Sequence, residues 1–431
     1  MAPMPPAAIS TRDTGSLTPA QMRTLALTSL GGALELFDFV IFVYFVPSLA
    51  AAFFPPGIPH WLAELQTFVV FAVGYFARPF GGVVVAHFGD RVGRKRTFGF
   101  TVTLMAGATL GMAVLPPYAV IGIAAPLLLS LLRIIQGIAV GGEVAGGYLF
   151  GAEHVADSRR GRACGFVAGG MTSGVLLGVG VATLIHHMLG AADILAWGWR
   201  LAFVLGGGLG LLTLVLRRDL HETPVFRALE ESGRISARLP LGEVLRAHRR
   251  AILLSVGAFW SFIAHFVVLC LMGPTLLQSL FQLSAVDALG AGCFATATFV
   301  LCAPLSGLLF DRMGPGPALV LLCLMALMGD ALFLLGSRGA PDLVVPLFMV
   351  AGAGGGLLGG ASVVMIRAFP PAIAYTGVSL SLNIVSGIMA GLTPVLIAGL
   401  LPWLPSAPLW YLAAACLSGV AVGAVLWRSQ G

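Results

Sequence analysis

The sequence contains few charged residues. Only 10 % of its 431 residues are Asp, Glu, Lys or Arg, whereas a soluble protein carries about 25 %. So few charges cannot cover the surface of a soluble protein, and 58 % of the residues are hydrophobic. This composition excludes a soluble enzyme and a secreted disulfide-stabilised domain. The net charge of +6 comes from short basic loops between apolar runs, so it does not indicate a nucleic-acid partner.

Motifs for catalysis and ATP binding are also missing. We find no Walker A loop, zinc motif or nucleophile elbow, so we expect no cofactor, no metal and no enzymatic activity. The six cysteines lie within or at the ends of apolar runs without metal-type spacing, which is typical of small apolar helix residues. Residues 1–22 lack the apolar core and cleavage site of a signal peptide, which predicts a cytoplasmic tail.

Apolar segments long enough to cross a bilayer, about 20 residues each, recur along the chain. We count twelve, near residues 24–54, 61–88, 97–116, 119–151, 162–189, 198–216, 251–281, 286–310, 317–337, 342–368, 373–401 and 406–427. The sequence therefore predicts an all-α membrane protein. Its expected parts are a six-helix bundle at 23–216, a cytoplasmic loop at 217–250, a second six-helix bundle at 251–427 and a tail at 428–431.

Arginine and lysine gather in the loops on one side of this predicted membrane protein. The loop after the second segment is basic, and the central loop holds eight arginines. Basic loops face the cytoplasm, and an even number of crossings puts both termini on the same side. We therefore expect a multi-pass protein of the inner (plasma) membrane with both termini in the cytoplasm.

Two carboxylates lie within the first apolar segment. An ionisable side chain inside a bilayer costs about 2.5–3.5 kcal/mol on insertion scales, so each one needs a functional or structural reason. Glu35 and Asp38 are three residues apart, which places them on one face of a helix. Because two ionised carboxylates that close repel each other, a proton on one of them is favoured. The pair indicates proton coupling; a permanent ion pair with an arginine is the alternative.

Arg133, Gln136 and Glu143 lie in the fourth segment, within an arc of about 80° on a continuous helix. Arginine keeps its charge, so Arg133 must meet a carboxylate of the protein or of a substrate. We predict that Arg133 and Gln136 bind substrate and that Glu143 takes part in proton coupling. A permanent pair of Arg133 with one of the nearby carboxylates is the alternative.

Polar side chains also occur in the second, seventh and eleventh segments. His265 and Asn383 are candidates for substrate binding, although such residues are more often packing residues. Arg78, followed by Pro79, is expected to fix loop geometry rather than to touch substrate.

Short motifs connect the sequence to a known family. The stretch GDRVGRKR at 89–96 closely resembles the signature loop of the major facilitator superfamily. Within that superfamily, GGALELFDF at 31–39, ARPFGG at 77–82, RIIQGIAVGGE at 133–143 and YTGVSLSLNIVSGIMAGLTP at 375–394 resemble the metabolite:proton symporters. The loop at 310–314 (FDRMG) also resembles 89–93 (GDRVG), as internal repeats of such transporters do.

The resemblance implies a twelve-helix fold in two six-helix bundles, alternating access and proton-driven import of a small metabolite. It also implies a cytoplasmic gating loop formed by Asp90, Arg91, Gly93 and Arg94. Two departures leave the substrate open. The second loop, DRMGPGP at 311–317, has few basic residues, and Ala374 stands where relatives often have arginine.

The leading hypothesis is therefore a monomeric, proton-coupled symporter of a small organic acid such as a di- or tricarboxylate. Its alternatives are a proton symporter of a zwitterion such as proline or betaine, a proton-driven exporter and, less favoured, a non-transporting sensor. The expected partners are the substrate, protons and the lipid bilayer.

Overall fold

The structure, a computed structural model, describes residues 17–92, 94–216, 241–370 and 373–429. Side chains are described there except at 83–98, 214–216 and 243. In the described part, ten helical segments have the length and apolar character needed to cross a membrane, and Gly99–Val114 is a shorter apolar helix. Together with the long helix α3 (His60–Val92) they make the twelve-helix all-α fold that the sequence predicts.

Six crossing segments come before the central gap. They are α1, η1 and α2 as one segment (Pro19–Val40, Ile41–Phe45, Val46–Phe53), α3, α4 (Arg94–Val114), α6 with α7 (Ala124–Val140, Glu143–Glu153), α8 (Arg160–Met188) and α10 (Trp199–Leu216). Short helical turns connect some of them: α5 (Tyr118–Ile121), η2 (Asp157–Arg159), α9 (Ala191–Asp193) and η3 (Ile194–Gly198).

Six more segments follow α12 (Leu241–Ala247). They are α13, η4 and α14 (Arg249–His265, Phe266–Leu271, Gly273–Phe281), α15 (Ala285–Met313), α16 with η5 (Pro315–Ala331, Leu332–Gly336), α18, η7 and α19 (Val344–Gly356, Gly359–Ala361, Ser362–Ala368), α20, η9 and α21 (Ala374–Ile384, Val385–Ala390, Gly391–Leu400) and α22 (Ala407–Arg428). Short turns α17 (Ser337–Gly339) and η6 (Pro341–Leu343) precede α18.

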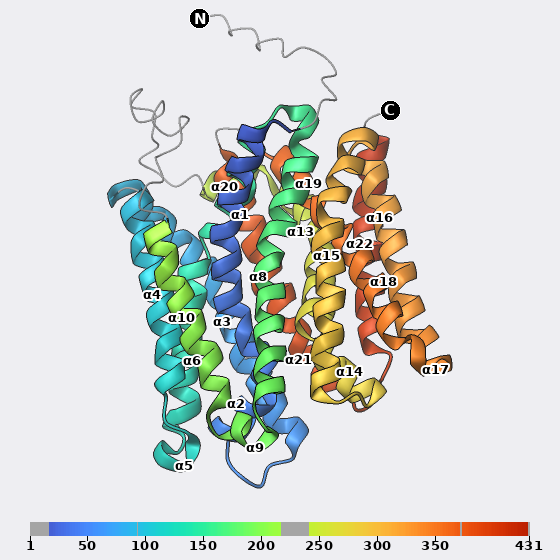
Figure 1. The fold of residues 1–431 in the computed structure, drawn as a ribbon. Coiled ribbons are helices and arrows are strands. Elements are labelled where there is room, and N and C mark those ends of the chain that lie inside the picture. Colours follow the sequence, from blue (N-terminus) through green and yellow to red (C-terminus); the bar gives the residue numbers. More distant parts are fainter. Residues whose placement is uncertain (1–16, 93, 217–240, 371–372, 430–431) are drawn as a thin grey trace, which may run out of the picture.

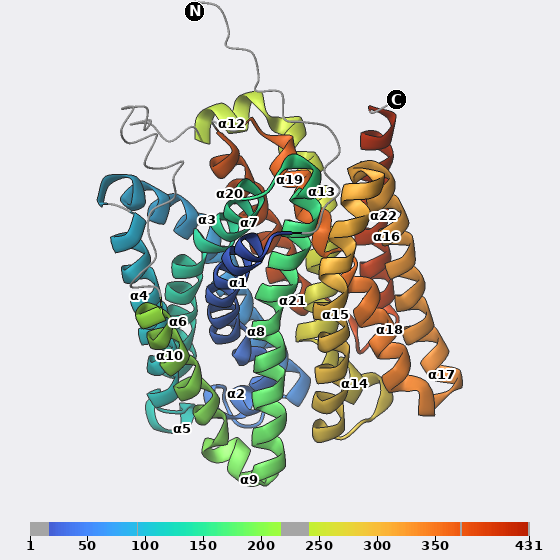
Figure 2. The ribbon, with the colours of Figure 1, turned by 45° about the horizontal axis from the view of Figure 1, so that its top comes forward.

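The helices run side by side in two groups. Figure 1 shows the first six segments, from blue to green, on one side and most of the later ones, from yellow to red, on the other, with α20 beside α1 and both termini at the same end. Figure 2 shows α12 lying across that end. The two groups meet at three contacts between helices. Helix α8 packs on α15, α3 packs on α21 and η9, and α7 packs on α20.

Several crossing segments are interrupted. The fourth segment is broken at Gly141 and Gly142 between α6 and α7, where the sequence predicted a continuous run at 119–151. Glycine has low helix propensity, and the break leaves the Gly141 carbonyl free to accept a hydrogen bond from Asn383 of the other bundle. Segments η4, η5 and η9 are π-helical, a form that is frequent at functional sites.

Polar contacts join the bundles at the end that carries the termini. Asp311, in α15, accepts hydrogen bonds from the Gly161 amide (2.7 Å), the Arg162 amide (3.1 Å) and Arg162 Nε (3.0 Å). Arg367 Nη2 donates to the Asp157 carbonyl at 2.9 Å. Asp311 belongs to the second loop, at 311–317, which resembles the signature loop at 89–96 but has few basic residues. This loop thus supplies the carboxylate that holds the first turn of α8.

Polar contacts also join the bundles toward the opposite end. The Tyr44 hydroxyl, in η1, donates to the Cys270 carbonyl of η4 at 2.9 Å. The Thr183 hydroxyl lies 3.4 Å from Cys293 Sγ. Because cross-bundle contacts exist toward both ends, the described structure corresponds to a closed conformation.

Replacing Asp311 with alanine removes the acceptor of the three hydrogen bonds that tie α8 to α15. We expect the bundles to separate more readily at this end, so that labelling of the buried Cys164 by a thiol reagent rises severalfold. Peptide mass spectrometry measures the labelling, with the half-buried Cys302 as the internal reference. Asp311→Asn keeps one acceptor oxygen and should give an intermediate rate; equal labelling in all three proteins would contradict the assignment.

Candidate functional site

Arg133 is the centre of the polar site in the N-terminal bundle. It lies in α6 and is fully buried. Its Nη1 donates to the Phe39 carbonyl of α1 at 3.0 Å and to Gln136 Oε1 at 2.7 Å. The structure therefore brings together Arg133 and Gln136, the two residues of the fourth segment predicted to bind substrate.

One edge of the Arg133 guanidinium has no hydrogen bond. Its Nε and Nη2 are buried without a hydrogen-bond partner among the described residues. These two nitrogens form the side of the guanidinium that binds a carboxylate with two parallel hydrogen bonds. Gly74 of α3 faces this edge: a Cβ there would lie 3.4 Å from Nε and 3.5 Å from Nη2. A side chain at position 74 would therefore cover this edge and would also lie 3.0 Å from the Arg133 carbonyl oxygen.

Aromatic rings surround the same guanidinium. Arg133 Cζ lies 4.4, 4.8 and 4.9 Å from the ring centres of Phe39, Phe42 and Phe71. A cation within about 6 Å of a ring is stabilised by the ring quadrupole. Tyr75 packs edge-on against Phe39 at 4.9 Å and against Phe71 at 5.1 Å. The result is a cation-binding aromatic surface made by α1 and α3.

Asp38 lies on the other side of this network. It is 1 % exposed, next to Thr109 of α4 and close enough to interact electrostatically with Arg133. Neither of its oxygens has a hydrogen bond of regular geometry in the described part of the chain. Gln136 Nε2 donates to the Thr109 hydroxyl at 2.6 Å. A polar line thus runs from Arg133 through Gln136 and Thr109 to Asp38.

The other two predicted proton-coupling residues lie at the margin of this line. Glu35 is buried one turn before Asp38 and interacts with neighbouring groups. Glu143 is half-buried at the start of α7. It follows the interruption at Gly141 and Gly142, on a separate helix from Arg133.

Arg78 is a site residue that sequence reasoning assigned to loop geometry. It is 4 % exposed, and its Cζ lies 5.4 Å from the ring centre of Tyr75 and 6.0 Å from that of Phe39. Tyr75 itself faces the other bundle, because a Cβ at Gly391 of α21 would lie 3.1 Å from Tyr75 Cβ. Arg78 therefore contributes a second buried positive charge next to the aromatic surface.

Asn383 connects the site to the C-terminal bundle. Its Nδ2 donates to the Gly141 carbonyl at 2.7 Å and to the Ser379 carbonyl at 2.9 Å, and its Oδ1 has no hydrogen-bond partner among the described residues. Tyr375 adds a second cross-bundle hydrogen bond, from its hydroxyl to the Gly142 carbonyl at 3.1 Å. Asn383 thus lies where the bundles meet, at the break in the fourth segment.

His265 belongs to a different cluster. Its side chain is fully buried in the C-terminal bundle and contacts Asp330 of α16 at 2.8 Å. Asp330 was missed in the sequence, although an acidic residue within the apolar run 317–337 is itself a signal.

The positions of the four predicted gating side chains are not described by the structure. Gly93 lies outside the described residues, and so do the side chains of Asp90, Arg91 and Arg94. Asp90 and Arg91 fall within helix α3, which ends at Val92, rather than in an open loop.

Comparison with known proteins identifies the family. A proline/betaine transporter of Salmonella typhimurium is 31 % identical over 419 residues, which cover 93 % of this chain and 82 % of that protein. The glycine betaine/proline/ectoine/pipecolic acid transporter OusA of Dickeya dadantii is also 31 % identical, over 420 residues and the same shares of both chains.

A solved structure shares the fold. The xylose symporter XylE bound to 6-bromo-6-deoxy-D-glucose superimposes with a TM-score of 0.74 over 96 % of each chain, at 19 % identity. The profile of the Major Facilitator Superfamily matches residues 28–394. This chain is a multi-pass membrane transporter that belongs to the major facilitator superfamily.

Proposed function

We propose that this transporter imports a small zwitterion of the proline/betaine type together with a proton. The observation that carries the proposal is the Nε–Nη2 edge of Arg133, which has no hydrogen-bond partner among the described residues and is buried among aromatic rings near Asp38. A substrate carboxylate fits this edge with two charge-assisted hydrogen bonds. An organic acid was the leading hypothesis from the sequence; the transporters that this chain resembles at 31 % identity support the zwitterion alternative instead.

The aromatic surface suits the cationic end of such a substrate. Quaternary ammonium groups bind in cages of aromatic rings. Tyr75 extends the surface of Phe39 and Phe71 toward α21, so a substrate held by Arg133 has aromatic faces beside it. Asn383, with its free Oδ1, is proposed to contact substrate from the other bundle.

The balance of buried charges argues against a tricarboxylate. Arg78 and Arg133 carry two positive charges, and Glu35 and Asp38 carry two negative charges when both are ionised. A zwitterion with one coupled proton brings this sum to +1, and a dicarboxylate with one proton brings it to −1, so the charge balance argues most strongly against a tricarboxylate. A tricarboxylate adds three negative charges to a buried site, where uncompensated charge is costly. One coupled proton offsets only one of them.

Asp38 is the proposed coupling residue. An ionised Asp38 competes with the substrate carboxylate for Arg133, to which it is electrostatically linked. Protonation of Asp38 removes this competitor and leaves the Arg133 edge to the substrate. Proton and substrate therefore bind together and are released together, which is the requirement for symport. Roles for Glu35 and Glu143 in proton coupling, and for His265 in substrate binding, stay predictions.

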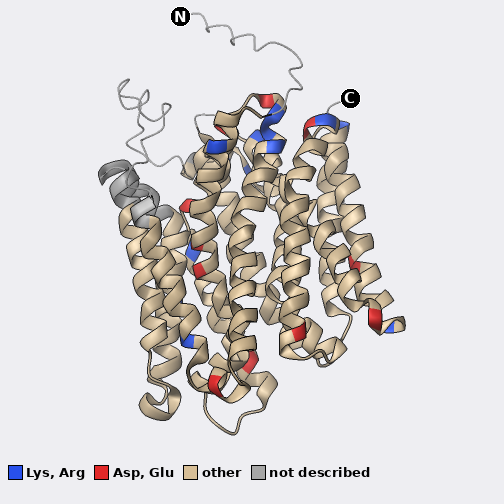
Figure 3. Ribbon diagram, viewed as in Figure 1, with Lys and Arg blue, Asp and Glu red and all other residues tan. Residues whose placement is uncertain are grey.

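We propose that both termini are cytoplasmic. Figure 3 shows Lys and Arg gathered at the end that carries the termini, where basic residues face the cytoplasm. The hydrogen bonds of Asp311 would then close the cytoplasmic side, and the hydrogen bond of Tyr44 would close the outer side. The two sides would open in turn. That the protein is a monomer stays a prediction.

Uptake into proteoliposomes tests the proposal. We expect proline or glycine betaine to accumulate, and citrate, dicarboxylates and shikimate not to. A zwitterion carried with a proton moves one positive charge, so an inside-negative potential alone should drive uptake. An uncoupler should abolish accumulation. Accumulation of a tricarboxylate, or of no compound by folded protein, would contradict the proposal.

Substituting Arg133 with lysine should weaken substrate binding while the fold is retained. An ammonium cannot form the two parallel hydrogen bonds of a guanidinium, and a hydrogen bond to a charged group contributes about 1.5–3 kcal/mol. Binding should therefore weaken about ten- to hundredfold, as measured by titration of the purified protein with proline and betaine.

A glycine pair provides the matched control for this test. Gly74→Ala places a methyl group beside the Arg133 edge and should also weaken binding. Gly107→Ala, where nothing lies within 4 Å, should not. Equal affinities in wild type, Arg133→Lys and Gly74→Ala would assign Arg133 to structure.

Asp38→Asn should separate binding from coupling. An amide cannot carry the proton, but it does not compete for Arg133 either. The variant should therefore bind and exchange labelled substrate across the membrane without concentrating it. Counterflow and gradient-driven uptake measure the two activities, with Glu35→Gln as the neighbouring comparison. Full accumulation by Asp38→Asn would remove Asp38 from the proton path.

A further inference from the structure

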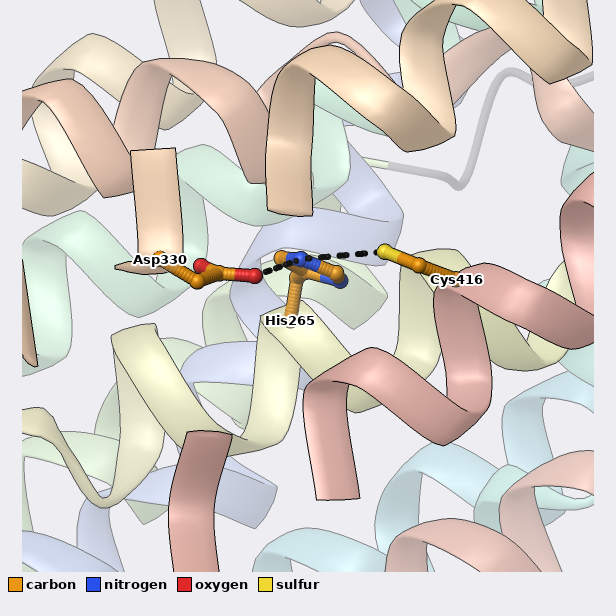
Figure 4. Close-up of side chains that lie close together, drawn as sticks. All are labelled: His265, Asp330 and Cys416. Carbon is orange, nitrogen blue, oxygen red and sulfur yellow. Dashed lines mark hydrogen bonds and ion pairs between the residues drawn. The ribbon is translucent and has the colours of Figure 1, made fainter. Parts of the chain in front are cut away.

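A second buried group of titratable side chains lies within the C-terminal bundle. His265 at the end of α13, Asp330 near the end of α16 and Cys416 in α22 point toward one another (Figure 4). The side chains of His265 and Asp330 are 0 % exposed, and His265 Nε2 lies 2.8 Å from Asp330 Oδ2. Cys416 Sγ lies 3.9 Å from the same nitrogen.

The geometry of the pair fixes how many protons it holds. His265 Nδ1 lies 2.7 Å from the Ser261 carbonyl, which can only accept a hydrogen bond, so Nδ1 carries a proton. The contact between Nε2 and Asp330 Oδ2 needs another proton between them, because a bare ring nitrogen and a carboxylate are both acceptors. The pair thus holds two protons and has no net charge, whether as imidazolium–carboxylate or as imidazole–carboxylic acid.

Loss of one of these protons would leave a buried negative charge. The neighbours of the pair are Cys416 of α22, together with Cys323 of α16 and Ser261 of α13, which lie next to it. Thiols and a hydroxyl do not neutralise a carboxylate. Asp330 Oδ1 has no hydrogen-bond partner among the described residues. Since uncompensated charge in an apolar interior is costly, the pair retains its second proton.

The pair lies where two helices change their winding. His265 is the last residue of α13, directly before the π-helical η4, and Asp330 lies two residues before the π-helical η5. Segment η4 also supplies the Cys270 carbonyl that accepts the Tyr44 hydroxyl of the other bundle. The His265–Asp330 contact therefore ties α13 to α16 directly before η4, the segment whose Cys270 carbonyl takes part in closing the outer side.

We propose that His265 and Asp330 form a second proton-binding site, separate from Asp38, whose proton holds α13 and α16 together beneath η4. The proton count depends only on the pair itself; its link to the outer gate rests on the proposed function. In this assignment His265 is a positioning residue and does not touch substrate.

A metal ion is the competing ligand for the cluster. Ligand atoms of His265, Asp330 and Cys416 all lie within 4.8 Å of one another, and zinc accepts this donor set. However, two ligands of one tetrahedral zinc at about 2.1 Å lie about 3.4 Å apart. The His265–Asp330 contact of 2.8 Å is shorter and matches a hydrogen bond. We therefore assign a proton to the site.

Spectroscopy on purified, metal-free protein without substrate tests the assignment. At pH 8, above the ordinary histidine pKa of about 6.5, we expect one of two signals from the pair. The His265 ring is doubly protonated in ¹⁵N NMR, or Asp330 shows a protonated carboxyl band in the infrared. His265→Gln identifies the ring signal and Asp330→Asn the carboxyl band.

The variants have distinct expected spectra. Asp330→Asn should leave His265 neutral, because an amide can donate to Nε2. His265→Gln should leave Asp330 protonated. Cys416→Ala, the matched control, should keep the wild-type signal. Because no transport is measured, these results are independent of the substrate proposal.

Two outcomes would overturn the second proton site. In the first, the His265 ring is neutral at pH 8, and no protonated carboxyl band of the wild type disappears in Asp330→Asn. In the second, stoichiometric Zn²⁺ changes the His265 signal, a chelator reverses this change, and the change does not occur in Cys416→Ala. That result would assign the cluster to a metal. If Asp330→Asn does not fold, a carboxyl band that shifts in His265→Gln still identifies Asp330.

Discussion

Burial of Arg133 away from water is the constraint on which the site depends. A guanidinium keeps its charge, so the surrounding residues must compensate it. They do so only in part: Nη1 bonds to Phe39 and Gln136, three aromatic rings face the cation, and the Nε–Nη2 edge is left open. The unmet requirement for a carboxylate makes this edge suited to bind one, from Asp38 or from a substrate.

Close helix packing makes that arrangement possible. A Cβ at Gly137 of α6 would lie 1.9 Å from the Gly74 carbonyl of α3, so these helices touch through their backbones. At this distance the aromatic side chains of α3 reach around Arg133 from a neighbouring helix. Small residues at helix contacts are the usual means of close approach in membranes; here the contact also positions a charge.

The crossing segments were predictable from the sequence because apolar runs of about 20 residues are typical of membrane-spanning helices. The sequence also pointed to Arg133, Gln136 and Asp38, since polar groups are rare in such runs. The aromatic surface was not predictable, because Phe39 or Phe71 in an apolar run looks like any lipid-facing or core residue. Arg78 was expected to fix loop geometry, because its contacts with the rings of Phe39 and Tyr75 depend on how α3 packs on α1. The pairing of His265 with Asp330 depends on the contact between α13 and α16, which no local pattern encodes.

The two bundles treat their buried ionisable groups differently. In the N-terminal bundle, Arg133 and Asp38 keep atoms without a hydrogen-bond partner among the described residues, so a substrate or proton can change their partners. In the C-terminal bundle, His265 and Asp330 pair with each other through Nε2 and Oδ2, and only Asp330 Oδ1 is left without a partner among the described residues. A symporter needs a site in which charged groups can exchange partners. It also needs a second bundle that stays rigid while the bundle with that site moves relative to it. On this reasoning the Arg133 network changes state in each cycle, whereas the proton of the His265–Asp330 pair stays bound and keeps α13 in place while η4 opens and closes.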